Sequence, residues 1–328
     1  MPRIGMNPGR GKKSSYQPAR VTVAVLTHIP NQIGYFKDRL LITRTCLESI
    51  ITNTTAPYDL MVFDNGSCSE AVAMLNRMRD EGKIDFLVLS GQNIGKIGAL
   101  QVIYNAAPGE VIAYSDDDVF FLPGWLEQHL QVIDTYPNVG VVTGMYIKPH
   151  MKEGISSTVK FASRQGLKSE HGNLVDEAWE RHYIEQMGRT WERYQEEIEG
   201  LEDIRLTYKG IQTFVSAGHY QMTTFKTSLL KAMPENWSGN LMGQMRDLDV
   251  AIDKLGMLRL CTTPPTVRLL GNLIDEKSAN ELREYGVNVQ GNHKAKEPSA
   301  WKKMVYRNPL VQKIAYFFYE RLFKIINT

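Results

Sequence analysis

The chain has 328 residues, of which 43% are hydrophobic, and 38 Lys and Arg against 36 Asp and Glu give a formal net charge of +2. This composition excludes a globally disordered chain and a strongly polyanionic or polycationic protein, and the length suits one large domain or two small ones. The charge is unevenly distributed, because residues 1–20 carry +5, residues 294–328 carry +6 and the body between them carries −9. An acidic body with two basic ends bears on which partners the protein binds, but composition alone does not identify a partner.

Residues 1–20 combine Gly, Pro and Ser with basic residues and predict a flexible arm. Short β-rich runs then alternate with helical patterns. Strands are predicted at 21–26, 60–63, 86–89, 111–114 and 139–146, and helices at 38–51, 70–78, 97–106 and 124–135. Four repeats of strand then helix indicate an α/β fold with a mostly parallel sheet and helices on its faces.

Residues 150–209 depart from this alternation and are predicted to form a helical insertion. A long polar helix is expected at 175–199, and its aromatic stripe is interpreted as a packing seam. Beyond it we expect a strand at 211–225, helices at 229–233 and 247–255, and a strand at 258–261. The folded domain is therefore placed at 21–290.

The cysteines and the termini bear on the cellular setting. Three widely spaced cysteines indicate neither a disulfide framework nor a zinc knuckle, which favours a reducing, cytoplasmic setting. The first twenty residues lack the apolar run of a signal peptide, and charged residues interrupt the longest apolar stretch at 310–326. We therefore expect no membrane-spanning segment.

Sites in an open parallel sheet lie outside the carboxyl ends of its strands. Four polar clusters follow the predicted strands and should meet along one edge: Thr27–His28, Asp64–Ser67, Gln92–Asn93 and Asp116–Asp118. The acidic cluster is the strongest signal, because three adjacent carboxylates are costly to desolvate without a cation. Successive side chains in extended backbone alternate faces, so Asp116 and Asp118 can grip one divalent ion while Asp117 points elsewhere. A solvated acidic turn or a helix cap is the alternative.

The other clusters suit a nucleotide. Asp64 can accept hydrogen bonds from a base imide or a ribose hydroxyl, although Asn65-Gly66 also has the chemistry of an ordinary turn. The backbone N–H groups and Lys96 of the segment 91–98 can face phosphate at a helix start. This segment is not a Walker A loop, and the dinucleotide-binding glycine fingerprint is absent after the first strand.

Asp247 and Asp249 head a predicted helix, where acids most often cap the helix or pair with its dipole. The functional alternative is a general base for a hydroxyl acceptor, supplied from outside the metal cluster. His28 and His219 neighbour these segments, and each is more often a structural histidine. The absence of a G-x-S-x-G elbow disfavours a serine hydrolase.

The ordered set of motifs resembles the nucleotide-sugar-dependent glycosyltransferases of family 2, which have the GT-A fold. The matching segments are VTVAVLT at 21–27, VFDNGS at 62–67, NIGK at 93–96, SDDD at 115–118 and PGWL at 123–126. The resemblance implies a nucleotide-sugar-binding half at 21–146 and an acceptor half at 210–290. The residues expected to bind the nucleotide sugar are Thr27, Asp64, Asn65, Asn93, Lys96, Asp116 and Asp117. Asp116 and Asp118 match the D-x-D motif, with Asp118 the better candidate for direct contact with Mn²⁺ or Mg²⁺.

The resemblance also implies inversion, with a catalytic carboxylate at an E-D motif that heads a late helix. Arg246-Asp247 stands there, so Asp247 is the expected base and Asp249 the close alternative. A family segment that often carries His before Gly-Asn has Leu269 and Leu270 instead, so water is expected to complete the shell of the ion. His219 and Gln221 are expected to line the acceptor or donor-sugar pocket.

The predicted function is transfer of a sugar from a UDP- or GDP-type donor to a saccharide or lipid-linked acceptor. The alternatives are a retaining glycosyltransferase or a sugar nucleotidyltransferase on a related fold, or a catalytically degenerate nucleotide-sugar-binding module. The basic tail at 294–328 predicts an amphipathic helix, which either packs on protein or lies through 301–328 on the anionic inner face of the membrane. No nucleic-acid partner is expected, because the body is acidic and lacks an aromatic and basic stacking platform.

Overall fold

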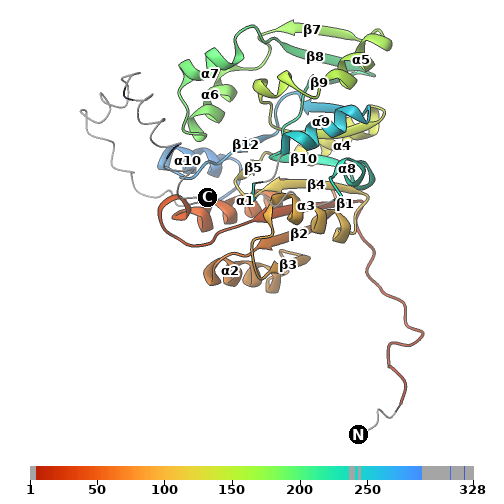
Figure 1. Ribbon diagram of the computed structural model, residues 1–328. Helices are drawn as coiled ribbons and strands as arrows, with labels where there is room; N and C mark the ends of the chain where they lie inside the picture. The colour runs from red at the N-terminus through yellow and green to blue at the C-terminus, as the bar shows by residue number, and fades with distance from the viewer. Residues whose placement is uncertain (1–4, 236–240, 243–244, 290–310, 312–320, 322–328) are drawn as a thin grey trace.

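The computed structural model describes residues 5–235, 241–242, 245–289, 311 and 321. A ten-stranded sheet crosses the molecule in the order β3-β2-β1-β4-β10-β6-β11-β9-β8-β7 (Figure 1). Its strands are β1 (Val21–Thr27), β2 (Tyr58–Asn65), β3 (Phe86–Ser90), β4 (Val111–Asp116), β6 (Val139–Thr143), β7 (Lys168–Gly172), β8 (Asp203–Tyr208), β9 (Ile211–Val215), β10 (Gln221–Phe225) and β11 (Leu258–Thr262). A separate antiparallel pair joins β5 (Val119–Phe121) to β12 (Val267–Leu269).

Most of the strands in this sheet point the same way. β3, β2, β1 and β4 are mutually parallel, and β10 runs antiparallel to both β4 and β6. β6 and β11 are parallel, whereas β9, β8 and β7 follow by antiparallel pairing. Only β10, β9 and β7 of the described sheet are therefore reversed, which confirms the predicted mostly parallel sheet.

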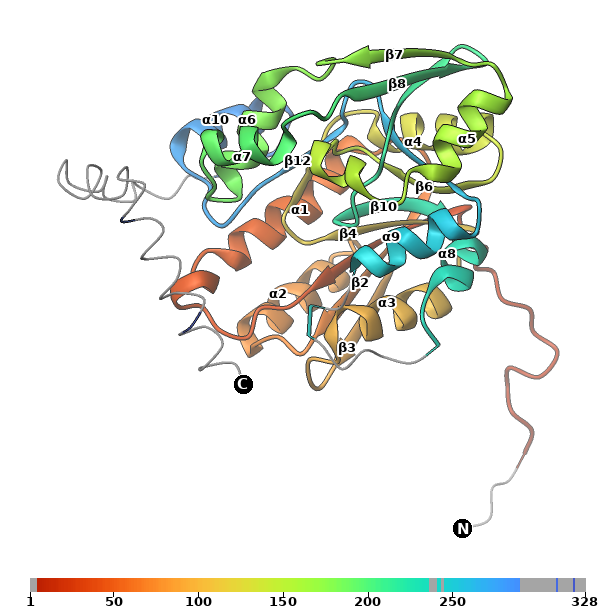
Figure 2. The same ribbon diagram turned by 45° about the horizontal axis from the view of Figure 1, so that its top comes forward.

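Helices cover both faces of the sheet (Figure 2). They are α1 (Arg39–Asn53), α2 (Ser69–Asp80), α3 (Gly95–Ala106), α4 (Trp125–Thr135), α5 (Ser156–Arg164), α6 (Glu177–Gln186), α7 (Trp191–Ile198), α8 (Lys226–Ala232), α9 (Met245–Lys254) and α10 (Glu276–Glu284), with short 3₁₀ turns η1 (Gly34–Phe36) and η2 (Lys148–Lys152). Val23 and Val25 of β1 belong to a core cluster that includes residues of α1, α2, α4 and α10, whereas Ala24 and Leu26 belong to a second cluster with residues of α3, α8 and α9. Because side chains alternate along a strand, β1 is buried on both faces, as a central parallel strand requires. The predicted α/β fold is confirmed.

The second half differs from its prediction in three places. The single helix expected at 175–199 is two helices, because Gly188 adopts a left-handed φ of +65° that ends α6 and the Thr190 hydroxyl caps α7. The strand expected at 211–225 is split into β9 and β10 at residues 216–220. The insertion at 150–209 is not only helical, since β7 and β8 within it extend the sheet at its outer edge (Figure 1).

The structure describes most of the N-terminal basic end but little of the C-terminal one. Residues 5–20 contain no helix or strand, but Tyr16 Oη and Ala19 N both donate to Asp59 Oδ2, at 2.9 and 3.0 Å. The arm is therefore attached to β2 from Tyr16 onward. Of the predicted helix in the tail at 294–328, the structure describes Val311 and Arg321, which are both helical, and the rest lies outside the described residues. In the described part of the chain, every helix is too short or too polar to cross a bilayer.

Candidate active site

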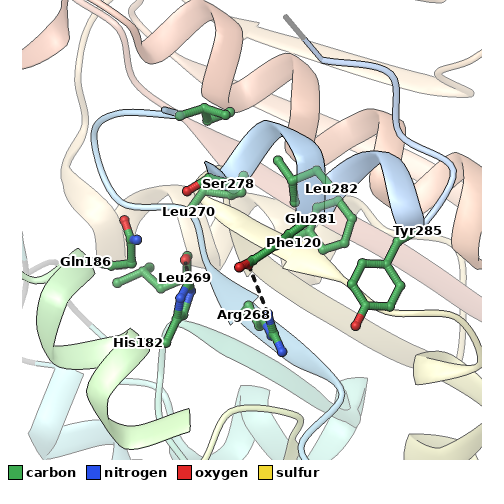
Figure 3. A pocket seen from close by; sticks show the side chains of 11 residues that line it. Phe120, His182, Gln186, Arg268, Leu269, Leu270, Ser278, Glu281, Leu282 and Tyr285 are labelled. Atoms are coloured by element: carbon green, nitrogen blue, oxygen red, sulfur yellow. Dashed lines mark hydrogen bonds and ion pairs between the residues drawn. The ribbon is translucent and has the colours of Figure 1, made fainter. Parts of the chain in front are cut away.

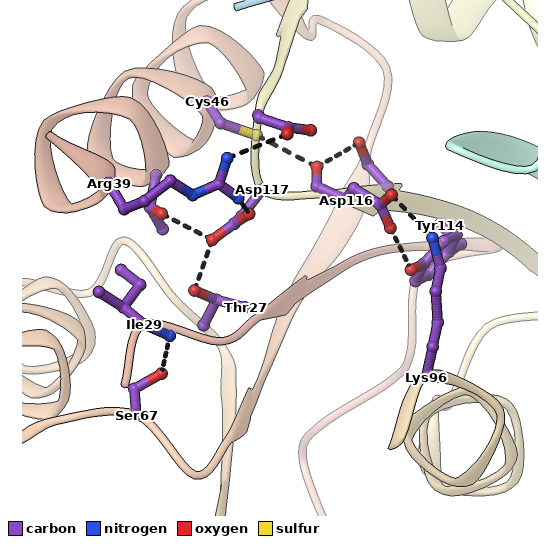
Figure 4. Close-up of polar contacts among 12 residues, drawn as sticks. Thr27, Ile29, Arg39, Cys46, Ser67, Lys96, Tyr114, Asp116 and Asp117 are labelled. Atoms are coloured by element: carbon purple, nitrogen blue, oxygen red, sulfur yellow. Dashed lines mark hydrogen bonds and ion pairs between the residues drawn. The ribbon is translucent and has the colours of Figure 1, made fainter. Parts of the chain in front are cut away.

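The carboxylate of Asp117 is held inside the protein just beyond β4 (Figure 4). Its Oδ2 accepts from Thr27 Oγ1 at 2.6 Å and from Thr43 Oγ1 at 2.7 Å, and its Oδ1 pairs with Arg39. The Asp117 side chain is 4% exposed. This arrangement differs from the expectation that Asp117 contacts the nucleotide sugar, because both of its oxygens serve to join β1, α1 and the turn after β4. The hydroxyl of Thr27, expected at the nucleoside, is likewise directed inward.

The two outer acids of the cluster are more exposed than the middle one, at 22% for Asp116 and 23% for Asp118. Lys96 Nζ lies 2.7 Å from Asp116 Oδ2, and Tyr114 Oη donates to Asp116 Oδ1 at 2.5 Å. Arg39 Nη1 lies 3.0 Å from Asp118 Oδ2. Cationic side chains from α3 and α1 therefore hold the two acids at the open edge of the sheet.

Burial and, to a smaller extent, the neighbouring carboxylates raise the pKa of Asp118. Burial raises the pKa of Asp118 to about 6, with the Arg39 guanidinium opposing the shift and the Asp116 and Asp117 carboxylates adding to it. Burial also raises the pKa of Tyr114 well above its usual value, with Asp116 adding to that shift, so Tyr114 stays a donor. Further positive charge next to the cluster would therefore stabilise its ionised carboxylates.

Asp64 stands at the end of β2 on the same edge and is 1% exposed. Its Oδ2 accepts from Ser67 N at 3.2 Å, whereas its Oδ1 is buried and has no hydrogen-bond partner among the described residues. A buried acceptor without a partner is uncommon in a native protein and calls for a ligand or water. Asp64 therefore lies at the sheet edge where the sequence predicts it, and one of its carboxylate oxygens has no partner among the described residues.

Asn65 and Asn93, expected to contact the nucleotide sugar, bond to each other instead. Asn65 Nδ2 donates to Asn93 Oδ1 at 3.0 Å, and Asn65 Oδ1 accepts from Ile94 N at 2.9 Å. Gly66 adopts a φ of +78°, and a Cβ there would lie 2.6 Å from the backbone carbon of Gln92. The loop that delivers Lys96 is therefore fastened to the end of β2.

The opposite side of the site is built from the segment before β10 and from α9. Asp116 N donates to the carbonyl of Tyr220 at 2.9 Å, and the rings of Tyr220 and His219 lie 4.8 Å apart. His219 Nδ1 is 3.0 Å from Asp249 Oδ2, and Arg259 Nη2 is 3.2 Å from the same oxygen. Asp249 is thus buried and paired, whereas Asp247 is exposed in the first turn of α9.

His150, from η2, joins this group by stacking on His219 with ring centroids 5.3 Å apart. Burial lowers the pKa of His150 to about 4, with the His219 charge adding to the shift, so the imidazole is neutral at neutral pH. Gln221 differs from its expected place in a sugar pocket. It is 1% exposed, and its Oε1 accepts from Gly144 N at 2.9 Å, because the first residue of β10 lies between β4 and β6.

A shallow hollow lies between α6, β12 and α10 (Figure 3). Its apolar lining includes Phe120, Leu270 and Leu282, and Arg268 Nη1 pairs with Glu281 across it at 3.6 Å. Leu270 N donates to the carbonyl of Asp118 at 2.7 Å. The loop at 269–270 therefore contacts the turn that carries the acidic cluster through its backbone.

Several residues of the site had no signal in the sequence. Arg39 and Thr43 fall within an ordinary helical pattern, and Tyr220, His150 and Arg259 reach the site only through tertiary contacts. The strand-end rule identifies the acids, but it does not identify their cationic and hydroxyl partners.

Comparison with known proteins places this chain in a family. The model for "Glycosyl transferase family 2" matches residues 36–224, which is more than half of the chain. An uncharacterized glycosyltransferase from Nostoc sp. is 26% identical over 122 residues, which cover 37% of this chain and 37% of that protein. The chain thus spans well under half the length of that curated relative.

Two solved structures are similar at low identity. The mannosyltransferase PcManGT from Pyrobaculum calidifontis, in complex with GDP-Man and Mn²⁺, is 18% identical with a TM-score of 0.43, and the match covers 76% of this chain and 56% of that one. Residues 1–349 of S. aureus TarS are 15% identical with a TM-score of 0.44, over 76% of this chain and 59% of that one. On the extent of the family match, this chain belongs to glycosyl transferase family 2.

Proposed function

We propose that the chain moves a sugar from a UDP- or GDP-type donor to a hydroxyl acceptor, with inversion and with the help of Mn²⁺ or Mg²⁺. The observation that carries this proposal is the buried, unpartnered Oδ1 of Asp64 on the edge that also presents Asp116 and Asp118. Leaving such an oxygen without a donor costs about 1–3 kcal/mol. A nucleobase imide or a ribose hydroxyl supplies that donor.

The donor set at Asp118 fits a hard divalent ion. Among the described residues, Arg39 pairs with Oδ2 of Asp118, and the Asp118 side chain is 23% exposed. The raised pKa of Asp118 means that a nearby cation would stabilise its ionised form. Mg²⁺ and Mn²⁺ are commonly held by one or two carboxylates, with substrate phosphates and water completing the shell. When bound, the ion would neutralise charge on the departing nucleoside diphosphate.

Residues of this chain would bind the diphosphate, accept the proton of the acceptor hydroxyl and hold the acceptor. Lys96 Nζ, held by Asp116 at the start of α3, brings positive charge to the diphosphate side. Asp247 is exposed at the head of α9 and would accept the proton of the acceptor hydroxyl. Asp249, the alternative base, is buried against Arg259 and His219, which favours Asp247 in this role. The hollow beside Leu270 would receive the acceptor.

A thermal-shift panel of nucleoside diphosphates with and without Mn²⁺ tests the donor site. We expect UDP or GDP to raise Tm, Asp64→Ala to weaken that binding at least tenfold, and Asp118→Asn to remove the Mn²⁺-dependent part. Asp59→Asn is the matched control, because Asp59 is a buried carboxylate at the other end of β2. The absence of any shift with every nucleoside diphosphate would reject the proposal.

The anomeric configuration of the product separates inversion from retention. Release of inorganic diphosphate rather than nucleoside diphosphate would indicate nucleotidyl transfer. Donor binding without transfer to any acceptor would favour the degenerate binding module.

A further inference from the structure

Three segments far apart in the sequence bring metal-binding side chains together on the side of the site opposite the aspartate cluster. His150 lies in η2, His219 lies between β9 and β10, and Asp249 lies in α9, and one ligand atom from each falls within 4.8 Å of the other two. His219 Nδ1 and Asp249 Oδ2 are 3.0 Å apart. This contact is a hydrogen bond. Ligand atoms of one ion with bonds of about 2.0–2.1 Å lie about 3.0–3.4 Å apart, so an ion could replace the hydrogen bond with little movement of the two side chains.

Two polar atoms of these three residues have no hydrogen-bond partner among the described residues. Asp249, whose side chain is 7% exposed, has a buried Oδ1 without a hydrogen-bond partner. His150 Nδ1 is also buried without a partner. Buried polar atoms are nearly always satisfied by protein, water or an ion, so two orphaned ligand atoms in one cluster point to a shared occupant.

Arg259 explains part of the arrangement but not these two atoms. Its Nη2 pairs with Asp249 Oδ2, and its Nη1 donates to the carbonyls of Glu153 and Gly154 at 2.9 Å. Arg259 therefore links α9 to the segment that follows η2 and orients Asp249, as hydrogen-bonding partners of metal ligands commonly do. It leaves Oδ1 of Asp249 and Nδ1 of His150 for an ion.

We propose that His150, His219 and Asp249 form a second metal site, separate from the aspartate cluster, for a divalent transition ion such as Zn²⁺. Two imidazole nitrogens and one carboxylate suit Zn²⁺, Co²⁺ or Ni²⁺ better than Mg²⁺ or Ca²⁺, which prefer oxygen ligands. With three protein ligands, the fourth position stays open. The ion would fasten η2 and α9 to the segment that carries Tyr220, and so would order the acceptor side of the site.

Calorimetric titration of the chelator-treated, full-length chain with ZnCl₂ tests this site without reference to activity. We expect one equivalent of Zn²⁺ to bind the wild type and to bind Asp118→Asn equally well, because Asp118 belongs to the other cluster. His150→Ala and His219→Ala should each weaken binding at least tenfold. His171→Ala, at an exposed histidine of β7, is the matched control and should bind as the wild type does.

The variants are chosen to keep the fold. Asp249→Asn is avoided because it removes the charge that pairs with the buried Arg259 guanidinium. Circular dichroism and metal-free Tm verify folding of His150→Ala, and His150→Gln replaces it if it fails to fold. Failure of Asp118→Asn to bind Zn²⁺, or wild-type affinity in His150→Ala or His150→Gln, would overturn the site.

Discussion

Arg39 is the residue on which the acidic cluster most depends. Its side chain is 9% exposed and pairs with both Asp117 and Asp118. Removal of one partner of a buried ion pair leaves an uncompensated charge and costs about 3–5 kcal/mol. We expect Arg39→Ala to lower the free energy of unfolding by that amount in a urea titration.

Arg20 is the control for this prediction, because it makes a bidentate pair with Asp134 but is 43% exposed. Exposed pairs contribute about 0–1 kcal/mol, so Arg20→Ala should have a small effect. Equal losses in the two variants would show that Arg39 does not hold the cluster together.

His129 makes stability depend on pH. It is fully buried, its ring nitrogens meet Thr223 Oγ1 at 2.7 Å and Thr266 Oγ1 at 3.0 Å, and burial lowers its pKa from 6.5 to about 3. Below pH 6.5 the unfolded chain binds a proton that the folded chain excludes. The contribution of His129 is therefore complete above that pH and is lost as pH falls toward 3, by at most about 1.4 kcal/mol per pH unit.

The variant His129→Gln cannot titrate. We expect its stability deficit at pH 7.5 to shrink by about 2 kcal/mol by pH 5, as measured by urea unfolding at several pH values. Parallel stability profiles of the two proteins would contradict a neutral, buried His129.

Among elements, the turn after β2 positions the loop before α3 through close approach at Gly66. Gly66→Ala places a Cβ 2.6 Å from the Gln92 backbone, at a φ of +78°. We expect it to destabilise the fold and also to weaken binding of a nucleoside diphosphate, because the loop that carries Lys96 must shift. Thermal shift and calorimetry measure the two effects.

Gly82 isolates the conformational part of that cost. Its φ is +73°, and a Cβ there would meet nothing within 4 Å. Gly82→Ala should therefore cost about 1 kcal/mol and leave nucleotide binding unchanged. Equal effects of the two substitutions on affinity would contradict the role of Gly66.

The hollow beside β12 allows a test of the acceptor half. Ser278, near the start of α10, lines this hollow. We expect Ser278→Trp to raise the KM for the acceptor several-fold while donor affinity stays constant. An unchanged acceptor KM would place the acceptor elsewhere.

The sequence predicts the first half of the fold well because each element there repeats one pattern. β1 to β4 are apolar strands that alternate with α1, α2 and α3, and the predicted ranges fall within or near the observed ones. The second half has strands at the sheet edge, such as β7, whose polar residues give no apolar run. The pair of β5 and β12 spans long sequence separations, which local pattern does not reveal.

The site follows the same division. Thr27, Asp64, Asn93 and Asp116 come together because parallel strands end at one edge, and contacts among their segments confirm that meeting. Which oxygen faces inward depends on partners such as Arg39 and Thr43, and these lie on a helix that the motif does not include. Contact of these residues with a nucleotide sugar stays a prediction.

For the whole molecule, the uneven charge predicts behaviour at surfaces. The tail carries +6 and aromatic residues, whereas the body carries −9. We expect the full chain to co-sediment with anionic vesicles and a chain without residues 301–328 to remain in the supernatant, with nucleotide binding equal in both. Sedimentation that does not depend on the tail would favour packing of the tail on protein.

The reversed direction of β10 has a consequence for how much change the insertion can tolerate. The chain leaves β6 at Thr143 and returns at Gln221, and the bond from Gly144 N to Gln221 Oε1 joins the points of exit and return. Residues 145–220, which contain the insertion, therefore form a closed excursion whose two ends are already neighbours. Since the entropy of closing a loop grows slowly with its length, this excursion can be lengthened, shortened or exchanged while the strands that carry Asp64 and Asp116 keep their register.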